Sequence, residues 1–202
     1  MSRKTPIKPQ LWTPRPVEET IAVYRDWADS YDADLADRGY HTPTRLVAAL
    51  AAHVATETTV LDFGCGTGIS GAALLERGFT HLHGTDVTPE MVEIARAKVI
   101  YERLWVSEPG APLPRAYDAI VAVGVVSLGA APPNTLSVLI DGLSPGGVLA
   151  LSFNDPTLAD GSYDAVLDSH VAKGEVTVTA REHGPHLDDV GMGSDVIVLR
   201  RA

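Results

Sequence analysis

The chain of 202 residues contains one cysteine, no surplus of basic residues and no long apolar run. Because Cys65 has no second cysteine to pair with, nothing in the sequence calls for an oxidising compartment. The formal net charge of −10 opposes binding to the phosphates of nucleic acid or to an anionic membrane. No apolar run approaches the ~20 residues that a membrane-spanning helix needs, and the first ten residues lack the apolar core of a secretory signal. We therefore expect a cytoplasmic protein without nucleic-acid or membrane partners, either a monomer or a homodimer.

The N-terminal segment differs in composition from the rest of the chain. Residues 1–16 contain four prolines and four basic residues but no acidic residue. The prolines exclude a regular helix, so this segment is expected to be a flexible basic tail, with Trp12 docked on the body. The chain is 45% hydrophobic, which suits one domain over residues 17–202. Residues 17–56 show helical periodicity and are expected to form an N-terminal helical lid on that domain.

Beyond the lid, short apolar strands alternate with helices. Strands are predicted at 60–63, 81–86, 104–106, 117–123 and 148–153. Helices are predicted at 69–76, 88–98, 135–143 and 163–172. This alternation is typical of a parallel sheet with helices on both faces.

The C-terminal residues follow a different pattern. Residues 175–181 and 195–200 alternate apolar and polar side chains with no helix between them, so they are predicted to form an antiparallel pair at the edge of the sheet. The residues between them, which include His183, His186, Asp188 and Asp189, are expected to form a solvated loop. The predicted fold class is α/β, a Rossmann-like doubly wound sheet that is mostly parallel.

The most informative stretch is a glycine-rich turn after the first strand, which reads VLDFGCGTG over residues 60–68. Glycines allow a ligand to approach the backbone, and free amides at the start of the following helix favour a negative group. The stretch matches GxGxG through Gly64, Gly66 and Gly68, while Gly66 to Gly71 also match the dinucleotide pattern GxGxxG. Because Gly64 directly follows the strand, the first of these two registers is favoured.

Asp86 follows the second predicted strand, about 20 residues after the glycine turn. An acidic residue at this place accepts hydrogen bonds from the ribose hydroxyls of an adenosine group. This feature fits a dinucleotide or another adenosine-containing cofactor equally well.

Four segments together resemble the class I S-adenosylmethionine-dependent methyltransferases: VLDFGCGTG, GTDVTPEMVEIAR, YDAIVAVGVVSLG and LSPGGVLALSF. The resemblance covers roughly residues 20–155, and the terminal strand pair agrees with the last strands of that family. The pattern of Tyr24, Trp27 and Tyr31, with Tyr40 and Pro43, is similar to the Williams–Beuren-region methyltransferase-like subgroup. The resemblance implies methyl transfer from S-adenosylmethionine, with S-adenosylhomocysteine as product, to an unidentified small-molecule acceptor by in-line displacement.

The resemblance also implies roles for individual residues. The glycines would lie against the methionine and ribose, Asp62 would orient the turn or reach the cofactor amino group, and Asp86 would hold the ribose. Glu108 would replace the acidic residue that contacts adenine in the family. The implied cofactor-binding set is Tyr24, Tyr31, Asp62, Gly64, Cys65, Gly66, Thr67, Gly68, Asp86, Val87, Met91, Glu108 and Gly124. The implied acceptor-binding set is Trp27, Ser127, Asn154 and Asp155.

No catalytic residue and no metal ligand are assigned. Many relatives carry a histidine pair after the fourth strand, where this chain has Val125 to Leu128, so the obvious base is missing. In-line methyl transfer needs a general base only if the nucleophile must lose its proton first. Cys65 is interpreted as a small turn residue, not as a nucleophile.

Two alternatives stay open at this point. The first is a nicotinamide-dependent oxidoreductase that uses the Gly66 to Gly71 pattern, although the long segment before the first strand and the terminal hairpin argue against it. The second is a protein that binds the cofactor without catalysis.

Overall fold

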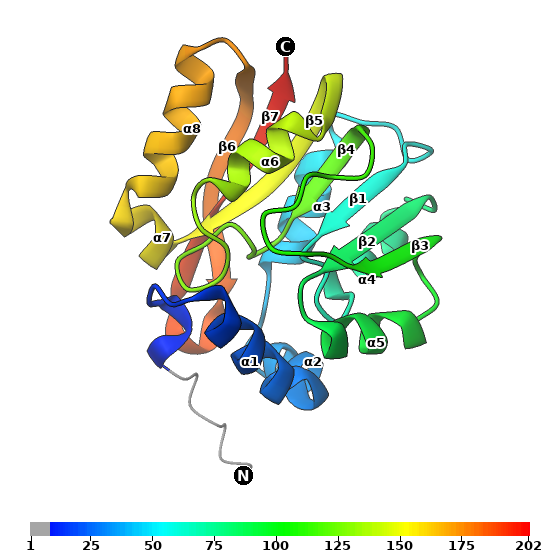
Figure 1. Cartoon of the computed structure of the whole chain (residues 1–202), viewed down its shortest axis with the longest axis vertical. Coiled ribbons are helices and arrows are strands. Elements are labelled where there is room, and N and C mark those ends of the chain that lie inside the picture. Colours follow the sequence, from blue (N-terminus) through cyan, green and yellow to red (C-terminus); the bar gives the residue numbers. More distant parts are fainter. Residues whose placement is uncertain (1–8) are drawn as a thin grey trace.

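The computed structural model describes residues 9–202 and contains a seven-stranded sheet with the strand order β3-β2-β1-β4-β5-β7-β6 (Figure 1). The strands are β1 Val60–Phe63, β2 Leu82–Asp86, β3 Arg103–Val106, β4 Tyr117–Ala122, β5 Leu143–Asn154, β6 Val176–Leu187 and β7 Met192–Arg201. The first five pair in parallel, and β7 pairs antiparallel with both β5 and β6. The predicted fold class is confirmed.

Helices cover both faces of the sheet (Figure 1). They are α3 Thr42–Ala51, α4 Ile69–Glu76, α5 Pro89–Ala97, α6 Thr135–Asp141, α7 Asp155–Asp160 and α8 Ser162–Ala172. Strand β4 explains why two cores form, because its inner residues are fully buried on both faces. Ile120 and Ala122 pack in the core under α6 and α8, while Ala119 and Val121 pack in the core under α3 and α4. A parallel strand buried on both faces reads as a continuous apolar run for this reason.

The N-terminal part lies across the edge of the sheet where the parallel strands end (Figure 1). It contains η1 Pro9–Trp12, α1 Val17–Trp27, η2 Ala28–Ser30 and α2 Tyr31–Asp37, so a 3₁₀ turn interrupts the helical segment expected over 17–56. Gly39 ends α2 with φ of +68°, and a Cβ there would lie 2.6 Å from Asp188 Oδ2. Residues 1–8 of the expected tail lie outside the described residues.

The C-terminal strand pair is longer than expected. Strand β6 continues to Leu187, and only η3 Asp188–Val190 and Gly191 separate it from β7. The prediction of a solvated loop is therefore wrong for His183 and His186, which lie on β6. The register of β6 shifts between Pro185 and Leu187, and Pro185 lacks the amide that a regular strand needs. The alternation of apolar and polar residues therefore ends before the strand itself ends.

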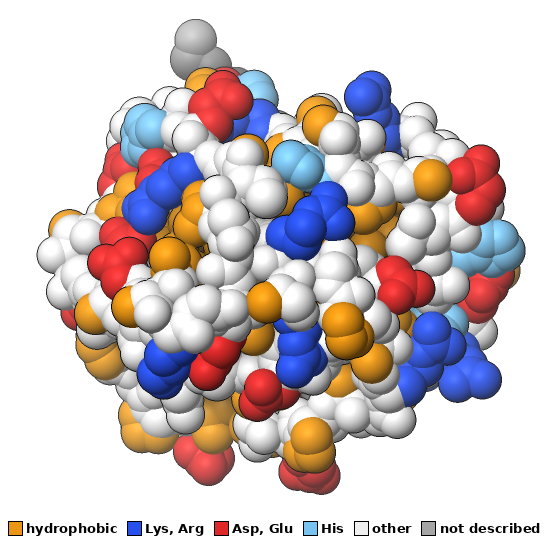
Figure 2. Space-filling view, turned by 90° about the horizontal axis from the view of Figure 1, so that it is seen from above, with side chains coloured by type: hydrophobic (Ala, Val, Ile, Leu, Met, Phe, Trp, Pro, Cys, Tyr) orange, Lys and Arg blue, Asp and Glu red, His pale blue; other side chains and the backbone are white. Residues whose placement is uncertain are grey.

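Charged side chains are mixed on the end of the molecule opposite the N-terminal helices. Figure 2 shows acidic and basic side chains interspersed on this face, with no broad area of one sign. None of the described helices is long and apolar enough to cross a membrane.

Candidate functional site

The glycine turn joins β1 to α4 in a conformation that favours glycine. Gly64, Gly66 and Gly68 have φ of +68°, +51° and +93°, in the left-handed region. A Cβ at Gly64 would lie 2.3 Å from Cγ2 of Val125, so the turn packs closely against the segment after β4. A Cβ at Gly66 would meet nothing within 4 Å. The middle of the turn therefore presents bare backbone to open space.

Asp86 binds the glycine turn directly from the end of β2. Its Oδ2 accepts a hydrogen bond from the Gly66 amide at 2.9 Å, and its Oδ1 accepts one from the Thr88 amide at 2.8 Å. Burial raises the pKa of this carboxyl. The structure thus brings Asp86, the residue expected to bind the ribose, together with the glycine turn.

Most amides of the turn are bonded within the chain. The Gly64 and Cys65 amides donate to the Thr85 carbonyl at 2.8 and 3.0 Å, and the Gly68 amide donates to the Cys65 carbonyl at 2.8 Å. These amides of the turn are therefore not free for a ligand, whereas the expected free amides lie at the start of α4, which begins at Ile69. Thr85 at the end of β2 supplies the acceptor for the first two of these bonds.

Asp62 lies fully buried on β1 beneath the turn. Its Oδ2 accepts hydrogen bonds from the Tyr101 hydroxyl at 2.6 Å and the Ser70 hydroxyl at 2.7 Å. Its Oδ1 is buried without a hydrogen-bond partner among the described residues. Burial raises the pKa of Asp62 to about 6, although both hydroxyl bonds lower it. Asp62 is thus a carboxylate with one oxygen in need of a donor.

The packing of Tyr101 explains the second glycine pattern, GxGxxG over Gly66 to Gly71. A Cβ at Gly71 would lie 2.2 Å from the Tyr101 hydroxyl oxygen. Gly71 therefore lets Tyr101 reach Asp62, and this packing accounts for the GxGxxG match without a dinucleotide. Tyr101 was not predicted as a site residue, because no local motif marks it.

Aromatic side chains of the N-terminal helices cover the turn. Trp27 packs against Tyr24 and Tyr31 with ring centroids 6.4 and 4.7 Å apart. Burial and the nearby Asp86 carboxylate raise the pKa of Tyr24 to about 12. The aromatic cover, defined as Tyr24, Trp27 and Tyr31, therefore lies close to the carboxylate at the end of β2.

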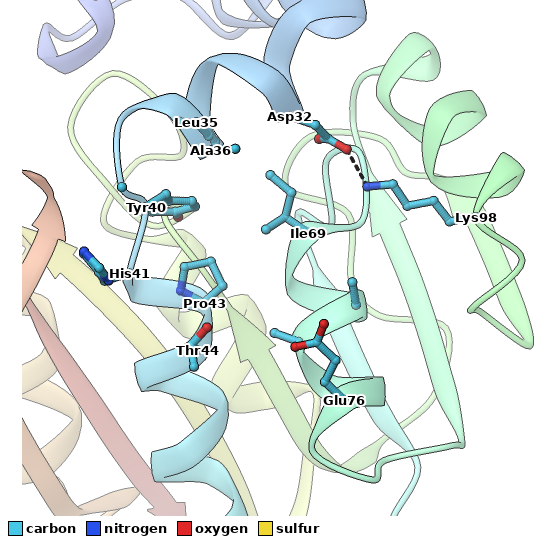
Figure 3. A pocket seen from close by; sticks show the side chains of 13 residues that line it. Asp32, Leu35, Ala36, Tyr40, His41, Pro43, Thr44, Ile69, Glu76 and Lys98 are labelled. Atoms are coloured by element: carbon cyan, nitrogen blue, oxygen red, sulfur yellow. Dashed lines mark hydrogen bonds and ion pairs between the residues drawn. The ribbon is translucent and has the colours of Figure 1, made fainter. Parts of the chain in front are cut away.

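Asp32 links the aromatic cover to the glycine turn. Its Oδ1 accepts a hydrogen bond from Thr67 Oγ1 at 2.5 Å, and its Oδ2 lies 2.6 Å from Lys98 Nζ. Figure 3 shows this ion pair at the end of a groove of about 440 Å³ between the α2–α3 segment and α4. Tyr40 and Ile69 also line the groove, but none of the predicted site residues does.

A second, smaller cavity of about 60 Å³ lies beneath the aromatic cover. The predicted residues Gly124, Ser127 and Asn154 line it together with the whole cover. The remaining lining residues are Leu11, Trp12, Leu35, Tyr40, Leu128, His186 and Leu187. Trp12 thus docks on the body, as expected. We call this space the acceptor cavity.

Two polar residues of the acceptor cavity are fixed by their neighbours. Ser127 Oγ donates to the Gly124 carbonyl at 3.1 Å. Asn154 Oδ1 caps α7 by accepting a hydrogen bond from the Thr157 amide at 3.1 Å. Because its oxygen is committed to this cap, Asn154 has its amide nitrogen left as a donor.

Other predicted residues lie outside the acceptor cavity. Glu108 is exposed in a turn after β3, and Asp155 Oδ2 accepts a hydrogen bond from the Gly193 amide at 2.7 Å. Val87 is half-buried, whereas Met91 is 1% exposed. Burial raises the pKa of the Cys65 thiol well above its usual value, which agrees with a structural role for this residue. Among the described residues, no cluster of potential ligands could hold a metal ion.

Comparisons with known proteins agree with this geometry. Residues 61–149 match a family model described as a methyltransferase domain. The human methyltransferase-like protein 27 is 37% identical over 141 residues, which are 66% of this chain and 57% of that protein. The chain therefore spans little more than half the length of this relative, whose similarity supports the predicted subgroup.

Solved structures share the fold at low sequence identity. A cyclase superposes with a TM-score of 0.71 at 17% identity, covering 94% of this chain and 97% of that one. The magnesium protoporphyrin IX methyltransferase of Synechocystis PCC 6803 with bound S-adenosylhomocysteine has a TM-score of 0.67 at 18% identity, covering 91% and 100%. The sequence matches, the strand order and the glycine turn all resemble those of the class I S-adenosylmethionine-dependent methyltransferases.

Proposed function

We propose that the chain transfers a methyl group from S-adenosylmethionine to a small-molecule acceptor. The observation that carries this proposal is the convergence of the glycine turn, Asp86 and Asp62 beneath the aromatic cover. When bound, the cofactor supplies a methyl group on a sulfonium sulfur, and this sulfur becomes a neutral thioether when the methyl group is transferred. The chain itself binds the cofactor and the acceptor, aligns them and excludes water.

The polar groups at the site match the donor groups of this cofactor. The buried, unpartnered Oδ1 of Asp62 needs a hydrogen-bond donor, which the ammonium of the cofactor, directly or through water, would provide. Asp86 would accept hydrogen bonds from the ribose hydroxyls beside Gly66, where a Cβ would meet only open space. Val87, Met91 and Glu108 remain the proposed surroundings of the adenine.

The aromatic cover suits the charge and the alignment that the reaction requires. An aromatic face stabilises a nearby cation by about 0.5–2 kcal/mol. Holding the nucleophile and the methyl group in line is worth up to roughly 7–11 kcal/mol. Asp32 ties the cover to Thr67 of the glycine turn, so closure over the cofactor and the conformation of the turn are coupled.

The acceptor cavity favours a small molecule as acceptor. It is narrow, it is lined mainly by aromatic and aliphatic side chains, and Leu11 and Trp12 close it on one side. The net charge of −10 also opposes a nucleic-acid acceptor.

The hydrogen bonds that the turn amides already make within the chain argue against binding of a nicotinamide dinucleotide. A pyrophosphate is bound by free backbone amides, but the turn amides of Gly64, Cys65 and Gly68 donate within the chain. Calorimetric titration with S-adenosylhomocysteine and, separately, with reduced nicotinamide dinucleotide tests the choice. Binding of the first alone is expected, and binding of the dinucleotide alone would refute the proposal. Incubation with labelled methyl donor and a metabolite pool then separates an enzyme from a protein that only binds the cofactor.

A further inference from the structure

His186 enters the acceptor cavity from β6 and was not identified from the sequence as part of the site. It lines the same cavity as Ser127, Asn154 and the aromatic cover. The residue is 6% exposed. A buried histidine in an otherwise aromatic and aliphatic cavity is the type of residue that can take up a proton there.

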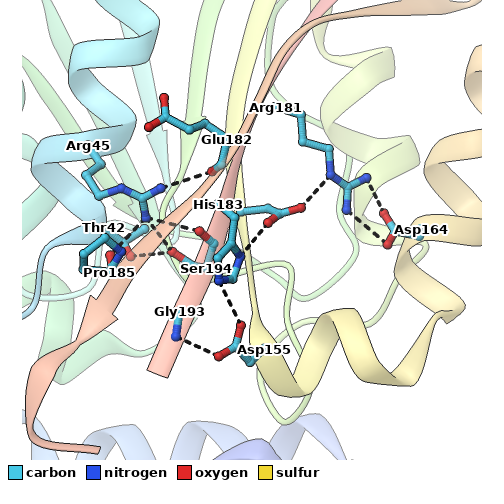
Figure 4. Close-up of polar contacts among 11 residues, drawn as sticks. Thr42, Arg45, Asp155, Asp164, Arg181, Glu182, His183, Pro185, Gly193 and Ser194 are labelled. Carbon is cyan, nitrogen blue, oxygen red and sulfur yellow. Dashed lines mark hydrogen bonds and ion pairs between the residues drawn. The ribbon is translucent and has the colours of Figure 1, made fainter. Parts of the chain in front are cut away.

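The ring of His186 is held by residues far away in the sequence. Its Nδ1 lies 2.7 Å from Thr42 Oγ1, which in turn lies 2.9 Å from Ser194 Oγ. Arg45 donates to Ser194 Oγ at 3.2 Å and to the Ser194 carbonyl at 3.2 Å, and Figure 4 shows Thr42, Ser194 and Arg45 in this arrangement. The ring also packs edge-on against Tyr40, with centroids 5.2 Å apart. These contacts fix which ring nitrogen is engaged.

The backbone holds His186 as well. The His41 amide donates to the His186 carbonyl at 3.0 Å, and Tyr40 forms an isolated bridge with Leu187. The segment between α2 and α3 is therefore bonded to β6 at His186 and at Leu187. With Nδ1 engaged by Thr42, and with no hydrogen bond to Nε2 from the described residues, Nε2 is the ring nitrogen left for a ligand.

We propose that His186 is the base of the methyl transfer, and that its Nε2 receives the proton of a hydroxyl group on a small apolar or aromatic acceptor. This inference rests on the proposed methyl transfer. It requires that Nδ1 carries the ring proton and donates to Thr42 Oγ1, whose own proton then goes to Ser194 Oγ. Arg45 supplies only donors, so Ser194 Oγ accepts from both neighbours through its two lone pairs.

The proton and electron balance of the step is closed. The acceptor O–H bond breaks and its proton goes to Nε2, while the oxygen forms a bond to the methyl carbon. The carbon–sulfur bond of the methyl donor breaks, and its electron pair stays on sulfur. One positive charge disappears from sulfur as one appears on the imidazole, so the cavity holds the same net charge before and after transfer.

The surroundings of His186 favour a hydroxyl over an amine as acceptor. An aliphatic amine is charged at neutral pH, and its ammonium would stand beside the sulfonium in a cavity with aromatic walls. Asn154 offers a donor nitrogen that suits the lone pairs of an oxygen. Burial lowers the pKa of His186 to about 4, an effect that Asp155 opposes and Arg45 strengthens. Tyr24, Tyr31 and Tyr40 are the other titratable groups that line the cavity. His186 is neutral at pH 7, so its Nε2 lone pair can receive the proton as the acceptor oxygen becomes acidic in the course of methyl transfer.

Nitrogen NMR of protein labelled at histidine tests the proposal, with 4-nitrophenol as the probe in the presence of S-adenosylhomocysteine. Before the probe is added, His186 is expected to be neutral with its proton on Nδ1. On addition, the Nε2 signal is expected to shift because this nitrogen accepts a hydrogen bond from the probe hydroxyl, which keeps its proton at rest since the lowered pKa of His186 makes the imidazole a weaker base than the phenolate. A proton found on Nε2 at the start, or a signal that the probe leaves unchanged, would overturn the proposal.

Two variants complete the test. His186→Asn keeps an amide near Nδ1 to bond Thr42 but removes the nitrogen at Nε2. It is expected to bind S-adenosylhomocysteine within twofold of wild type and to methylate 4-nitrophenol at least ~100-fold more slowly at saturating donor. His183→Asn, on the same strand but outside the cavity, is the control and should keep both wild-type properties. Wild-type rates in His186→Asn would overturn the role of His186 alone, whereas a wild-type protein that does not bind S-adenosylhomocysteine would overturn the proposed function and this inference together.

Discussion

Replacing Asp62 by Asn removes a buried charge from beneath the glycine turn, so its effect on stability should depend on pH. The folded-state pKa of about 6 lies above the usual 3.8. The stability that the protonated carboxyl contributes is therefore complete below about pH 3.8 and is lost as the pH rises through about 6. Linkage between these two values gives a cost of about 2 kcal/mol at pH 5 and about 3 kcal/mol at pH 7.5. Asn cannot ionise, so the advantage of the variant should grow by about 1 kcal/mol over this range.

Urea unfolding at pH 5 and pH 7.5, followed by circular dichroism, measures this difference. Asn keeps an oxygen that can accept from Tyr101 and Ser70, so the hydrogen bonds beneath the turn should survive. Asp118→Asn makes the same change at an exposed position of β4 and controls for the loss of net charge. Titration at pH 7.5 should show at least ~10-fold weaker binding of S-adenosylhomocysteine to Asp62→Asn, since a charge-assisted hydrogen bond to the ammonium is lost. A stability difference that is constant with pH would refute the assigned burial cost, and unchanged binding would refute the role of Asp62 towards the cofactor.

Three further predictions concern other parts of the site. Asp86→Ala should weaken S-adenosylhomocysteine binding at least ~10-fold while circular dichroism shows an intact fold; an unchanged dissociation constant would exclude the ribose assignment. Gly71→Ala should lower the free energy of unfolding by about 1–3 kcal/mol, because the new methyl group meets the Tyr101 hydroxyl at 2.2 Å; wild-type stability would show that Tyr101 does not need this space. The folded-state pKa of His186 is lowered to about 4, so unfolded chains bind more protons, and wild type should lose about 2 kcal/mol relative to His186→Asn as the pH falls from 7 to 4.5. Chemical unfolding at both pH values measures this last difference, and parallel stability curves for the two proteins would contradict it.

The parallel part of the fold could be predicted because each element there carries its own signal. The ranges 60–63 and 69–76 were predicted to the residue, since a buried apolar run, a glycine turn and a helical stripe follow one another without interruption. Helix α7 was missed because Asp155 to Asp160 form less than two turns, too short for periodicity to reveal. The break at Ala28–Ser30 was also missed, because no glycine or proline marks it.

The site was predictable only where a local motif carries it. The glycine turn and Asp86 are separated by a strand–helix–strand unit of ordinary length, so their meeting follows from the topology. The contact between Thr42 and His186 joins residues 144 positions apart, and only the sheet order brings them together. Thr42 illustrates the difficulty, because its place before Pro43 at the start of a helix is typical of a capping residue, whereas its hydroxyl bonds His186 and Ser194 and makes no capping bond to α3.

The charges around the glycine turn decide between ligands more firmly than the glycines themselves. Asp62 and Asp86 both have pKa values raised by burial, so each carboxylate is more stable beside a cation. Lys98, which approaches Gly68, is already paired with Asp32 and leaves these two carboxylates uncompensated. A dinucleotide would bring two phosphate charges to this turn, and its repulsion from two carboxylates would add to the loss of amide donors. S-adenosylmethionine carries a positive ammonium and a positive sulfonium. Its binding would therefore offset the free-energy cost of burying the charged carboxylates of Asp62 and Asp86. Binding of this cofactor should therefore shift the titration of both carboxyl groups to lower pH, an effect that carbon NMR of the aspartates can detect and that a negatively charged ligand would reverse.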